Sequence, residues 1–320
     1  MRVLFLMVLY AGLCYASSDQ ENIETLMDNV LVLRVPYGVS STKYVPLSCG
    51  EAYQNQPVVW KKDGEIIPDL QGNQVKVLVK DLDGGNYTCH LSPDGEYLNY
   101  TVILIQIDPA NRTYILEKKS HKEGHISCSA SNYRDSFHCS WTRTQYRQNA
   151  AVLLVKAERH SENISCELDA NGSGIHCQDS NCPYKEEQHS ISITIYIYNS
   201  ALLEAYTKVF YLRDIVKPEK VQNLQISNER VFSWEYPESW EKPCTYFGLQ
   251  FHVKVVKKGF NCDSENNITL NTTQETKYEV NVKTKKFVFC VRANDKFTNG
   301  PFSDWNQCIV DKETMSCAST

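Results

Sequence analysis

Residues 83–89 read Asp-Gly-Gly-Asn-Tyr-Thr-Cys, and this stretch decides the fold of the first third of the chain. Its tyrosine, Tyr87, stands two positions before Cys89, while Cys49 comes earlier and is followed by Trp60. Two cysteines at this distance can join opposing sheets, with the tryptophan packed on the bridge and the tyrosine at a strand corner. In the chain-entropy model such a bridge restricts the unfolded chain by about 3–4 kcal/mol.

This arrangement is typical of an immunoglobulin-like sandwich, and the remainder of the chain also reads as strands. Short runs rich in Val, Ile, Tyr, Phe and Thr recur between turn signals. Within residues 191–198, isoleucine alternates with Ser, Thr or Tyr, and this period of two indicates a strand with one buried face. We therefore predict an all-β protein made of sandwich modules in series.

The chain of 320 residues has room for two or three domains, and two stretches that contain proline mark the joints. Ile107-Asp108-Pro109 ends one apolar run, and Arg213-Asp-Ile-Val-Lys-Pro218 precedes a fresh alternation. Proline fixes φ and cannot donate to a β-ladder, so each joint should be a short elbow. The predicted segments are residues 1–16, 17–106, 107–214, 215–310 and a polar tail, 311–320.

The first of these segments reads as a signal peptide. Arg2 precedes an apolar run, residues 3–13, and small residues end the segment before Ser17. The run has only about half of the roughly 20 apolar residues that a membrane span needs. We therefore expect a secreted, extracellular protein that does not insert into membranes.

Cysteines and glycosylation sequons agree with export. Twelve cysteines follow Cys14, and in an exported chain they indicate disulfides rather than zinc ligands or reduced thiols. The sequons that begin at Asn86 and Asn99 lie in predicted strands, so we expect only some sequons to carry sugar. The predicted glycosylation sites are Asn111, Asn163, Asn171, Asn267 and Asn271.

The formal net charge of −5 is small for this length and gives no sign of a nucleic-acid-binding surface. The basic residues concentrate at Lys254, Lys257, Lys258, Lys283, Lys285 and Lys286. We interpret this concentration as a solvated strand face, and the alternative is a site for a sulfated polysaccharide.

The second segment carries its own motif. The run Cys128-Ser-Ala-Ser-Asn-Tyr-Arg-Asp-Ser-Phe-His-Cys139-Ser-Trp141 resembles the first fibronectin type III half of a class I cytokine-receptor module. The second half of such a module carries a Trp-Ser-x-Trp-Ser box. Residues 302–306, Phe-Ser-Asp-Trp-Asn, depart from that box at its first Trp and its last Ser.

The box stacks aromatic rings on guanidinium groups, and each contact is worth about 0.5–2 kcal/mol. Arg292 is the available cation here, and Phe302 and Trp305 are the available rings. Phe is a weaker partner than Trp, so we expect a shortened ladder with a structural role.

Four further stretches resemble the receptor-like beta-subunit family of the interleukin-12 and interleukin-23 type. They are Val231-Phe-Ser-Trp-Glu-Tyr-Pro237, Val291-Arg-Ala-Asn-Asp295, Arg213-Asp-Ile-Val-Lys-Pro218 and Cys177-Gln-Asp-Ser-Asn-Cys182-Pro183. The resemblance covers essentially the whole mature chain and implies one immunoglobulin-like domain followed by two fibronectin type III domains. It also implies a subunit that binds a four-helix-bundle alpha subunit and presents it to a cell-surface cytokine receptor. We also expect that two copies of the chain can form a homodimer.

The cysteines fall into the three modules as two, five and five, so the second and third modules each leave one thiol without a local partner. The resemblance pairs Cys128 with Cys139, which leaves Cys166 with Cys177, and it implies that Cys182 bonds to the alpha subunit. The alternative is a bond from Cys182 to Cys317. In the third module, Cys290 and Cys308 are equidistant from Asn299-Gly300, so we predict that they pair across a hairpin. The pairing of Cys244, Cys262 and Cys317 stays open.

An elbow between two fibronectin modules presents loops from both at one corner. The predicted contacts with the alpha subunit at this corner are Tyr133, Pro183, Tyr184, Glu186, Tyr246, Asp295 and Phe297. Aromatic walls and a carboxylate suit an arginine from a partner helix, because the charge is paired while the planar group stacks. The resemblance implies the same pocket, although Tyr184 stands where the family more often carries a small residue.

An enzyme is the least favoured class. His138-Cys139 and His176-Cys177 suggest a metal, but four ligands at metal-type spacing are absent and the cysteines have disulfide partners, so we predict no metal and no cofactor. No glycine-rich phosphate loop or nucleophile elbow appears in the sequence. Two other binding proteins fit the architecture: a soluble receptor alpha chain that captures a helical cytokine reversibly, and an adhesion protein.

Overall fold

The computed structural model describes residues 22–38, 40–108, 114–121, 123–134, 136–179, 187–227, 230–240, 248–298, 300–311 and 315–317. The predicted signal peptide lies outside these residues. The chain divides into two compact units, Met1–Thr113 with Tyr198–Glu204, and Tyr114–Ile197 with Ala205–Thr320. The predicted boundary at residue 214 falls inside the second unit, so the bounds of the two fibronectin type III domains stay a prediction.

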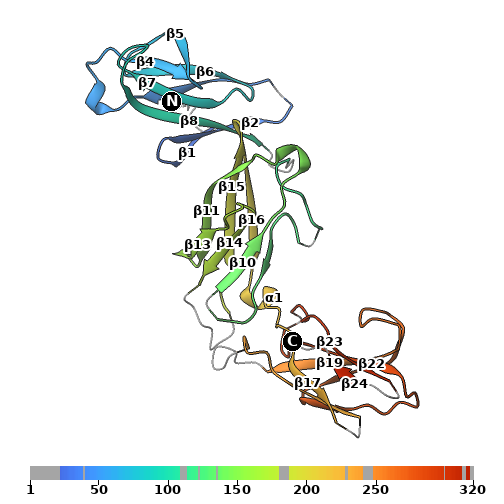
Figure 1. The fold of residues 1–320 in the computed structure, drawn as a ribbon. Coiled ribbons are helices and arrows are strands. Elements are labelled where there is room, and N and C mark those ends of the chain that lie inside the picture. The colour runs from blue at the N-terminus through green and yellow to red at the C-terminus, as the bar shows by residue number, and fades with distance from the viewer. Residues whose placement is uncertain are drawn as a thin grey trace, which may run out of the picture. The chain divides into compact units, whose positions relative to one another are not determined.

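The first unit is a two-sheet sandwich (Figure 1). Its larger sheet has the order β1-β2-β8-β7-β4-β5, in which β2 and β8 run parallel, and β3 pairs with β6 in the second sheet. Glu51–Tyr53 form a 3₁₀ turn. The strands are β1 (Ile23–Met27), β2 (Val30–Pro36), β3 (Thr42–Ser48), β4 (Val59–Lys62), β5 (Glu65–Gln71), β6 (Gln74–Lys80), β7 (Gly85–His90) and β8 (Tyr97–Asp108).

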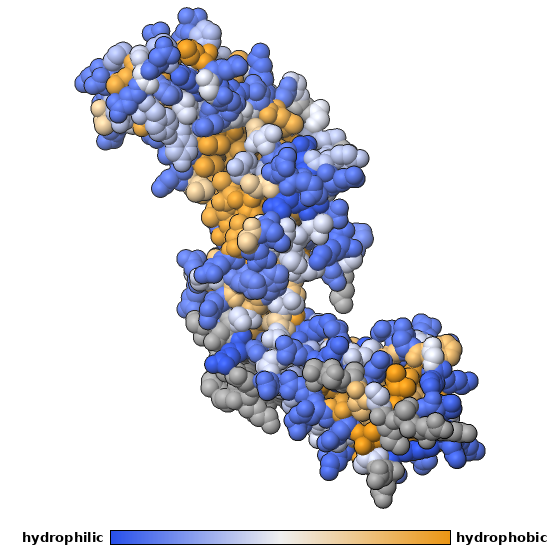
Figure 2. All heavy atoms as spheres, in the orientation of Figure 1, coloured by the Kyte–Doolittle hydropathy of each residue, from blue (hydrophilic) through white to orange (hydrophobic). Residues whose placement is uncertain are grey.

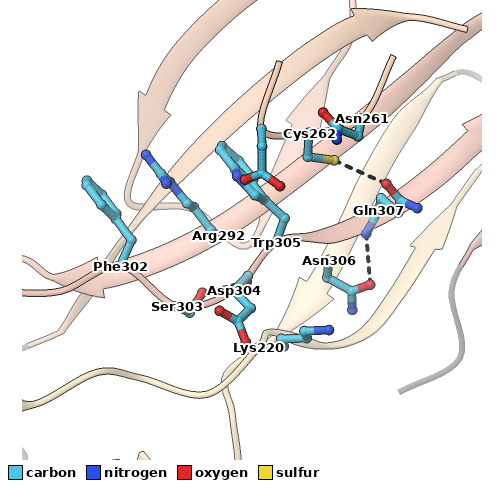
Figure 3. Close-up of a pocket in the computed structure, with 11 residues that line it drawn as sticks. Lys220, Asn261, Cys262, Arg292, Phe302, Ser303, Asp304, Trp305, Asn306 and Gln307 are labelled. Carbon is cyan, nitrogen blue, oxygen red and sulfur yellow. Dashed lines mark hydrogen bonds between the residues drawn. The ribbon is translucent and has the colours of Figure 1, made fainter. Parts of the chain in front are cut away.

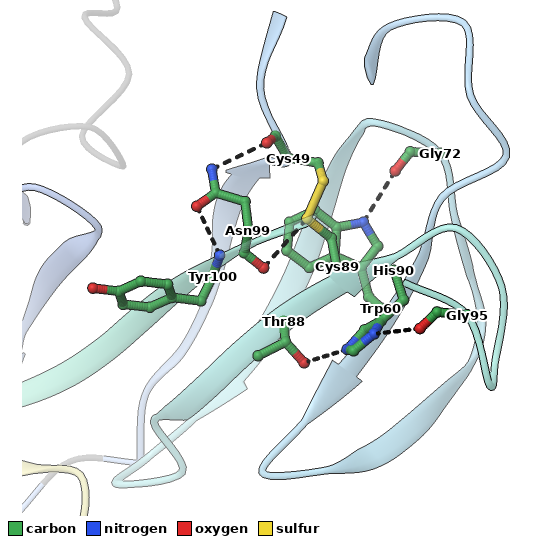
Figure 4. Close-up of a disulfide and its surroundings, with 9 residues drawn as sticks. All are labelled: Cys49, Trp60, Gly72, Thr88, Cys89, His90, Gly95, Asn99 and Tyr100. Atoms are coloured by element: carbon green, nitrogen blue, oxygen red, sulfur yellow. Dashed lines mark hydrogen bonds between the residues drawn. A yellow bond between two sulfur atoms is a disulfide. The ribbon is translucent and has the colours of Figure 1, made fainter. Parts of the chain in front are cut away.

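The core of the first unit has the predicted arrangement (Figure 4). A disulfide joins Cys49 to Cys89, and Trp60 is fully buried opposite Cys89 in the ladder. The indole Nε1 of Trp60 donates a 3.0 Å hydrogen bond to the carbonyl oxygen of Gly72. Gly84 is needed before β7 because any side chain there would meet the carbonyl oxygen of Ile103 at 2.3 Å. The stretch 83–89 therefore turns the chain tightly against β8 and then supplies one half of the disulfide.

The second unit begins with two sheets, of order β13-β14-β10-β9 and β12-β11-β15-β16. In β15 the side chains of Ile191, Ile193, Ile195 and Ile197 are all fully buried, as the period of two predicted. Figure 2 shows hydrophobic residues gathered over the β11 and β15 part of this unit, where residues 152–155 are half-buried. The strands are β9 (Ser127–Ser129), β10 (Ser136–Ser140), β11 (Ala151–Arg159), β12 (Glu162–Asn163), β13 (Ser165–Leu168), β14 (Gly174–Gln178), β15 (Ile191–Asn199) and β16 (Leu202–Phe210).

Two further sheets complete the second unit, of order β17-β18-β21 and β20-β19-β22-β23-β24. Phe232 of β18 and Phe289 of β22 stack with ring centroids 3.9 Å apart, which joins the two sheets through the core. The strands are β17 (Gln222–Ile226), β18 (Val231–Glu235), β19 (Leu249–Lys257), β20 (Asn267–Thr273), β21 (Lys277–Glu279), β22 (Phe287–Asp295), β23 (Asn306–Val310) and β24 (Met315–Cys317).

A short helix, α1 (Leu212–Ile215), connects β16 to β17 at the predicted elbow. Asp214 caps it by accepting a 3.0 Å hydrogen bond from the backbone N–H of Tyr211. The chain after α1 adds to the loop that follows β9, because Ala130 exchanges backbone hydrogen bonds with Ile215 and Lys217. The joint is therefore bonded to the β9–β10 loop.

No helix among the described residues is long and apolar enough to cross a bilayer.

Candidate subunit interface

Loops from the two halves of the second unit meet at Tyr133 and Asp295. Tyr133 lies between β9 and β10, and Asp295 is the last residue of β22. The Tyr133 hydroxyl donates a 2.8 Å hydrogen bond to Asp295 Oδ2. Both side chains are buried, and only 1% of the Asp295 surface is exposed. Two residues that the sequence assigned to one pocket thus lie together, as a buried pair.

The second carboxylate oxygen of Asp295 is engaged by its own loop. Oδ1 accepts hydrogen bonds from the backbone N–H groups of Phe297, at 2.7 Å, and Thr298, at 3.2 Å. These bonds compensate the burial of a charged group. Burial and the neighbouring charge of Asp295 raise the pKa of Tyr133, so its phenol stays a neutral donor. Because Asp295 is almost fully buried and already accepts three hydrogen bonds, it is not presented at the surface for an arginine from a partner.

Phe297 is the exposed aromatic residue of this corner, with 65% of its surface exposed. Sequence reasoning missed two nearby contacts. The ring of Trp240 meets Tyr133 edge-on with centroids 6.0 Å apart, and the Asn132 amide donates a 2.7 Å hydrogen bond to the carbonyl oxygen of Ser239. Trp240 could have been found, because a tryptophan in a polar loop needs a packing partner.

The other predicted contacts, Pro183, Tyr184, Glu186 and Tyr246, lie outside the described residues, as does Cys182.

A buried arginine joins the two residues that border segment 180–186. Arg159 of β11 donates to Asp179 Oδ2 through Nη2, at 2.7 Å, and to Glu187 Oε1 through Nη1, at 3.0 Å. Glu187 also accepts hydrogen bonds of 2.9 Å from the backbone N–H groups of Leu212 and Arg213, at the start of α1. Arg159 is 6% exposed, so this is a desolvated ion network. The sequence held a signal for it, because Arg159 stands two residues after the buried Ala157 on one face of a strand.

The disulfides of the second unit agree with the sequence at two places. Cys128 is bonded to Cys139, and Cys166 is bonded to Cys177. In each pair the two residues are direct partners in an antiparallel ladder, Cys128 with Cys139 and Cys166 with Cys177.

The predicted Cys290–Cys308 bond is wrong. Cys290 is bonded to Cys262, and Cys308 is bonded to Cys317. In the β22–β23 ladder Cys290 lies opposite Gln307, while Cys308 lies opposite Phe289. This offset of one residue places the two cysteines on opposite faces of the sheet. The alternative bond from Cys182 to Cys317 is wrong too, because Cys317 is bonded to Cys308. Cys244 lies outside the described residues.

The expected aromatic–cation ladder forms on β19, β22 and the segment before β23 (Figure 3). The guanidinium carbon of Arg292 lies 3.8 Å from the ring centroid of Phe302 and 4.3 Å from that of Trp305. His252 meets the other side of the ladder, with its ring centroid 4.5 Å from Phe302. Burial lowers the pKa of Arg292, and burial together with the Arg292 charge lowers the pKa of His252. The ladder lines a cavity of about 520 Å³ with Asp263 and Gln307.

Three of the six lysines of the basic concentration are engaged within the chain. Lys254 is buried, and its ammonium donates to the carbonyl oxygens of Cys262, at 2.8 Å, and Ser264, at 2.5 Å. Lys258 and Lys286 both pair with Asp311.

Four predicted glycosylation sites, Asn163, Asn171, Asn267 and Asn271, have exposed side chains, and Asn111 lies outside the described residues.

Comparison with known proteins shows which proteins this chain is similar to. The model of the family described as cytokine interleukin-12p40 C-terminus matches residues 123–199. The chain is 28% identical to interleukin-12 subunit beta of Papio anubis, over 94% of this chain and 97% of the relative. It is 27% identical to the same subunit of Homo sapiens, again over 94% and 97%, and 27% identical to that of Marmota monax over 98% of both chains. With its all-β fold and its immunoglobulin-type core, the chain is similar to interleukin-12 subunit beta over nearly its whole length, and the family model matches part of its second unit.

Proposed function

We propose that the chain is the secreted, receptor-like subunit of a heterodimeric cytokine, which binds a four-helix-bundle alpha subunit and presents it to a cell-surface receptor. The observation that carries this proposal is the corner where loops from both halves of the second unit meet, at Tyr133, Asp295 and the exposed Phe297. A helix face that packs there would bury the Phe297 ring beside a polar, preformed support. Aromatic anchors of this kind dominate the energy of many interfaces.

The cysteines support a covalent link. All ten cysteines among the described residues are bonded within the chain. Of the twelve that follow Cys14, only Cys182 and Cys244 lie outside these bonds and outside the described residues. We assign the interchain bond to Cys182, because the segment that carries it is bordered by the Arg159 network and lies in the half that contributes Tyr133.

The test is co-expression with the interleukin-12 alpha subunit of the same animal, followed by electrophoresis of the medium without reductant. We expect a covalent heterodimer for the natural chain and for Cys244→Ser, and its loss for Cys182→Ser. A covalent band that persists in Cys182→Ser contradicts the assignment. No covalent dimer with the natural chain would favour the soluble receptor alpha chain or a bond between Cys182 and Cys244. Mass mapping of the peptides separates those two outcomes.

A further inference from the structure

Three potential metal ligands gather on the outer face of the β13-β14-β10-β9 sheet. His138 of β10 and His176 of β14 are direct partners in the antiparallel ladder, and their ring centroids are 4.4 Å apart. Asp169 directly follows β13 and places its carboxylate at both rings. The neighbours of the two histidines in the strands, Phe137 and Cys177 among them, point into the core. The histidines therefore point away from the core.

The distances suit one ion. His138 Nε2 lies 3.0 Å from Asp169 Oδ2, and His176 Nε2 lies 3.5 Å from Asp169 Oδ1. One ligand atom from each of the three residues can be chosen so that all lie within 4.8 Å of one another. Zinc bonds of about 2.0–2.1 Å in tetrahedral geometry separate ligand atoms by about 3.3 Å. Small side-chain rotations are enough to place these three atoms around an ion.

The backbone around the cluster is fixed before any ion arrives. The Cys128–Cys139 and Cys166–Cys177 disulfides pin the strands beside both histidines. Asp169 is held in a turn, because its backbone N–H donates a 2.9 Å hydrogen bond to the carbonyl oxygen of Gly174. A site whose ligands are held by covalent and hydrogen-bonded supports loses little entropy on binding.

Gly174 has a specific place in this arrangement. A Cβ at this position would lie 2.2 Å from Asp169 Oδ2 and 2.7 Å from His138 Nε2. The carboxylate therefore reaches His138 across a residue that has no side chain, and any other residue would separate these two ligands. The absence of a side chain at Gly174 therefore supports the site separately from the identity of its three ligands.

We propose that His138, Asp169 and His176 form a binding site for a divalent transition-metal ion, with Zn²⁺ as the fitting ion for two imidazoles and one carboxylate. Their side chains are 34%, 21% and 72% exposed, so the site opens to solvent. Three protein ligands leave the fourth position of zinc for water or for a donor from another protein. The site is separate from the corner of Tyr133 and Asp295, and it stands whether or not the proposed function is correct.

The test is isothermal titration of the intact, chelator-treated chain with ZnCl₂ in a buffer that does not bind metal. We expect one tight equivalent, and a loss of about tenfold or more in affinity for each of His138→Gln, Asp169→Asn and His176→Gln. Gly174→Ala should weaken binding while every ligand remains. His189→Gln is the matched control, because it removes one ring of a different histidine pair. In that pair His189 stacks on His160 with ring centroids 3.9 Å apart.

A second measurement covers variants that fold poorly. Zinc that binds the folded chain raises its unfolding temperature, so the natural chain and His189→Gln should be stabilised by added zinc and the three ligand variants should not. Unchanged affinity in the ligand variants, or a loss confined to His189→Gln, overturns the proposal. A chain that binds no zinc at all also overturns it, and the cluster is then a hydrogen-bonded pair of Asp169 and His138 only.

Discussion

At the scale of single residues, Asp295 shows how the structure changes the meaning of a sequence signal. A carboxylate between Arg292 and Phe297 suggests an anchor for an incoming arginine. The structure instead gives both of its oxygens partners within the chain, from Tyr133 and from the loop after β22. The same bonds hold the loop that presents Phe297. We infer that Asp295 shapes the alpha-subunit surface, while Phe297 supplies the contact.

The change Asp295→Ala should therefore act first on folding. It removes the acceptor of two loop amides and one of the partners of the Tyr133 hydroxyl, at a cost of about 1–3 kcal/mol for each group that stays buried and unpaired. Chemical unfolding should show the loss, and Tyr146→Phe, at a position 90% exposed, should show none. In a Cys182→Ser background, affinity for the alpha subunit should fall more for Phe297→Ala than for Asp295→Ala in molecules that fold. The reverse order would restore Asp295 as an anchor.

At the scale of elements, the joint between β16 and β17 depends on the buried network around Glu187. This carboxylate binds the first two N–H groups of α1 and also neutralises Arg159. A helix of four residues cannot stabilise itself, because it closes only one turn for the entropy of several fixed residues. The network therefore determines where α1 begins.

Glu187→Ala should destabilise the second unit by about 3–5 kcal/mol, because it removes one partner of a desolvated pair and leaves Arg159 only partly compensated. Glu24→Ala is the matched control. Glu24 pairs with Arg34 at 2.7 Å, but both side chains are 51% exposed. Its loss should cost about 0–1 kcal/mol. Denaturant unfolding followed by tryptophan fluorescence measures both, and equal costs would show that burial of the network does not matter.

At the scale of the whole molecule, the two units have separate hydrophobic cores. One core contains Trp60 and the Cys49–Cys89 bond, and the other contains Trp141, Trp234 and the four-isoleucine face of β15. Since the proposed alpha-subunit surface lies in the second unit, we propose that the first unit binds a signalling receptor.

Deleting residues 17–106 should leave the heterodimer intact and abolish receptor engagement. Assembly is measured by electrophoresis of the medium, and engagement by binding of the purified heterodimer to cells that carry the receptor. The thermal unfolding of the shortened chain shows whether the second unit is folded. Failure to assemble, with the second unit folded, would contradict this division of roles.

The sequence by itself determined features that depend on near neighbours along the chain. The spacing of Cys49, Trp60 and Cys89 and the period of two in β15 both survive in the structure, because alternate side chains of a strand must face opposite sides. The proline of residues 213–218 predicted the elbow, and the resemblance supplied the pairing of Cys128 with Cys139.

Only the tertiary structure decided which distant residues share a face. An offset of one residue between β22 and β23 sends Cys290 to Cys262 and Cys308 to Cys317, and no local spacing reports that offset. The pairing of β10 with β14 likewise brings His138 beside His176. The physical reason is that ladder register is set by the packing of both sheet faces together, so a shift of one position exchanges every side chain between core and surface.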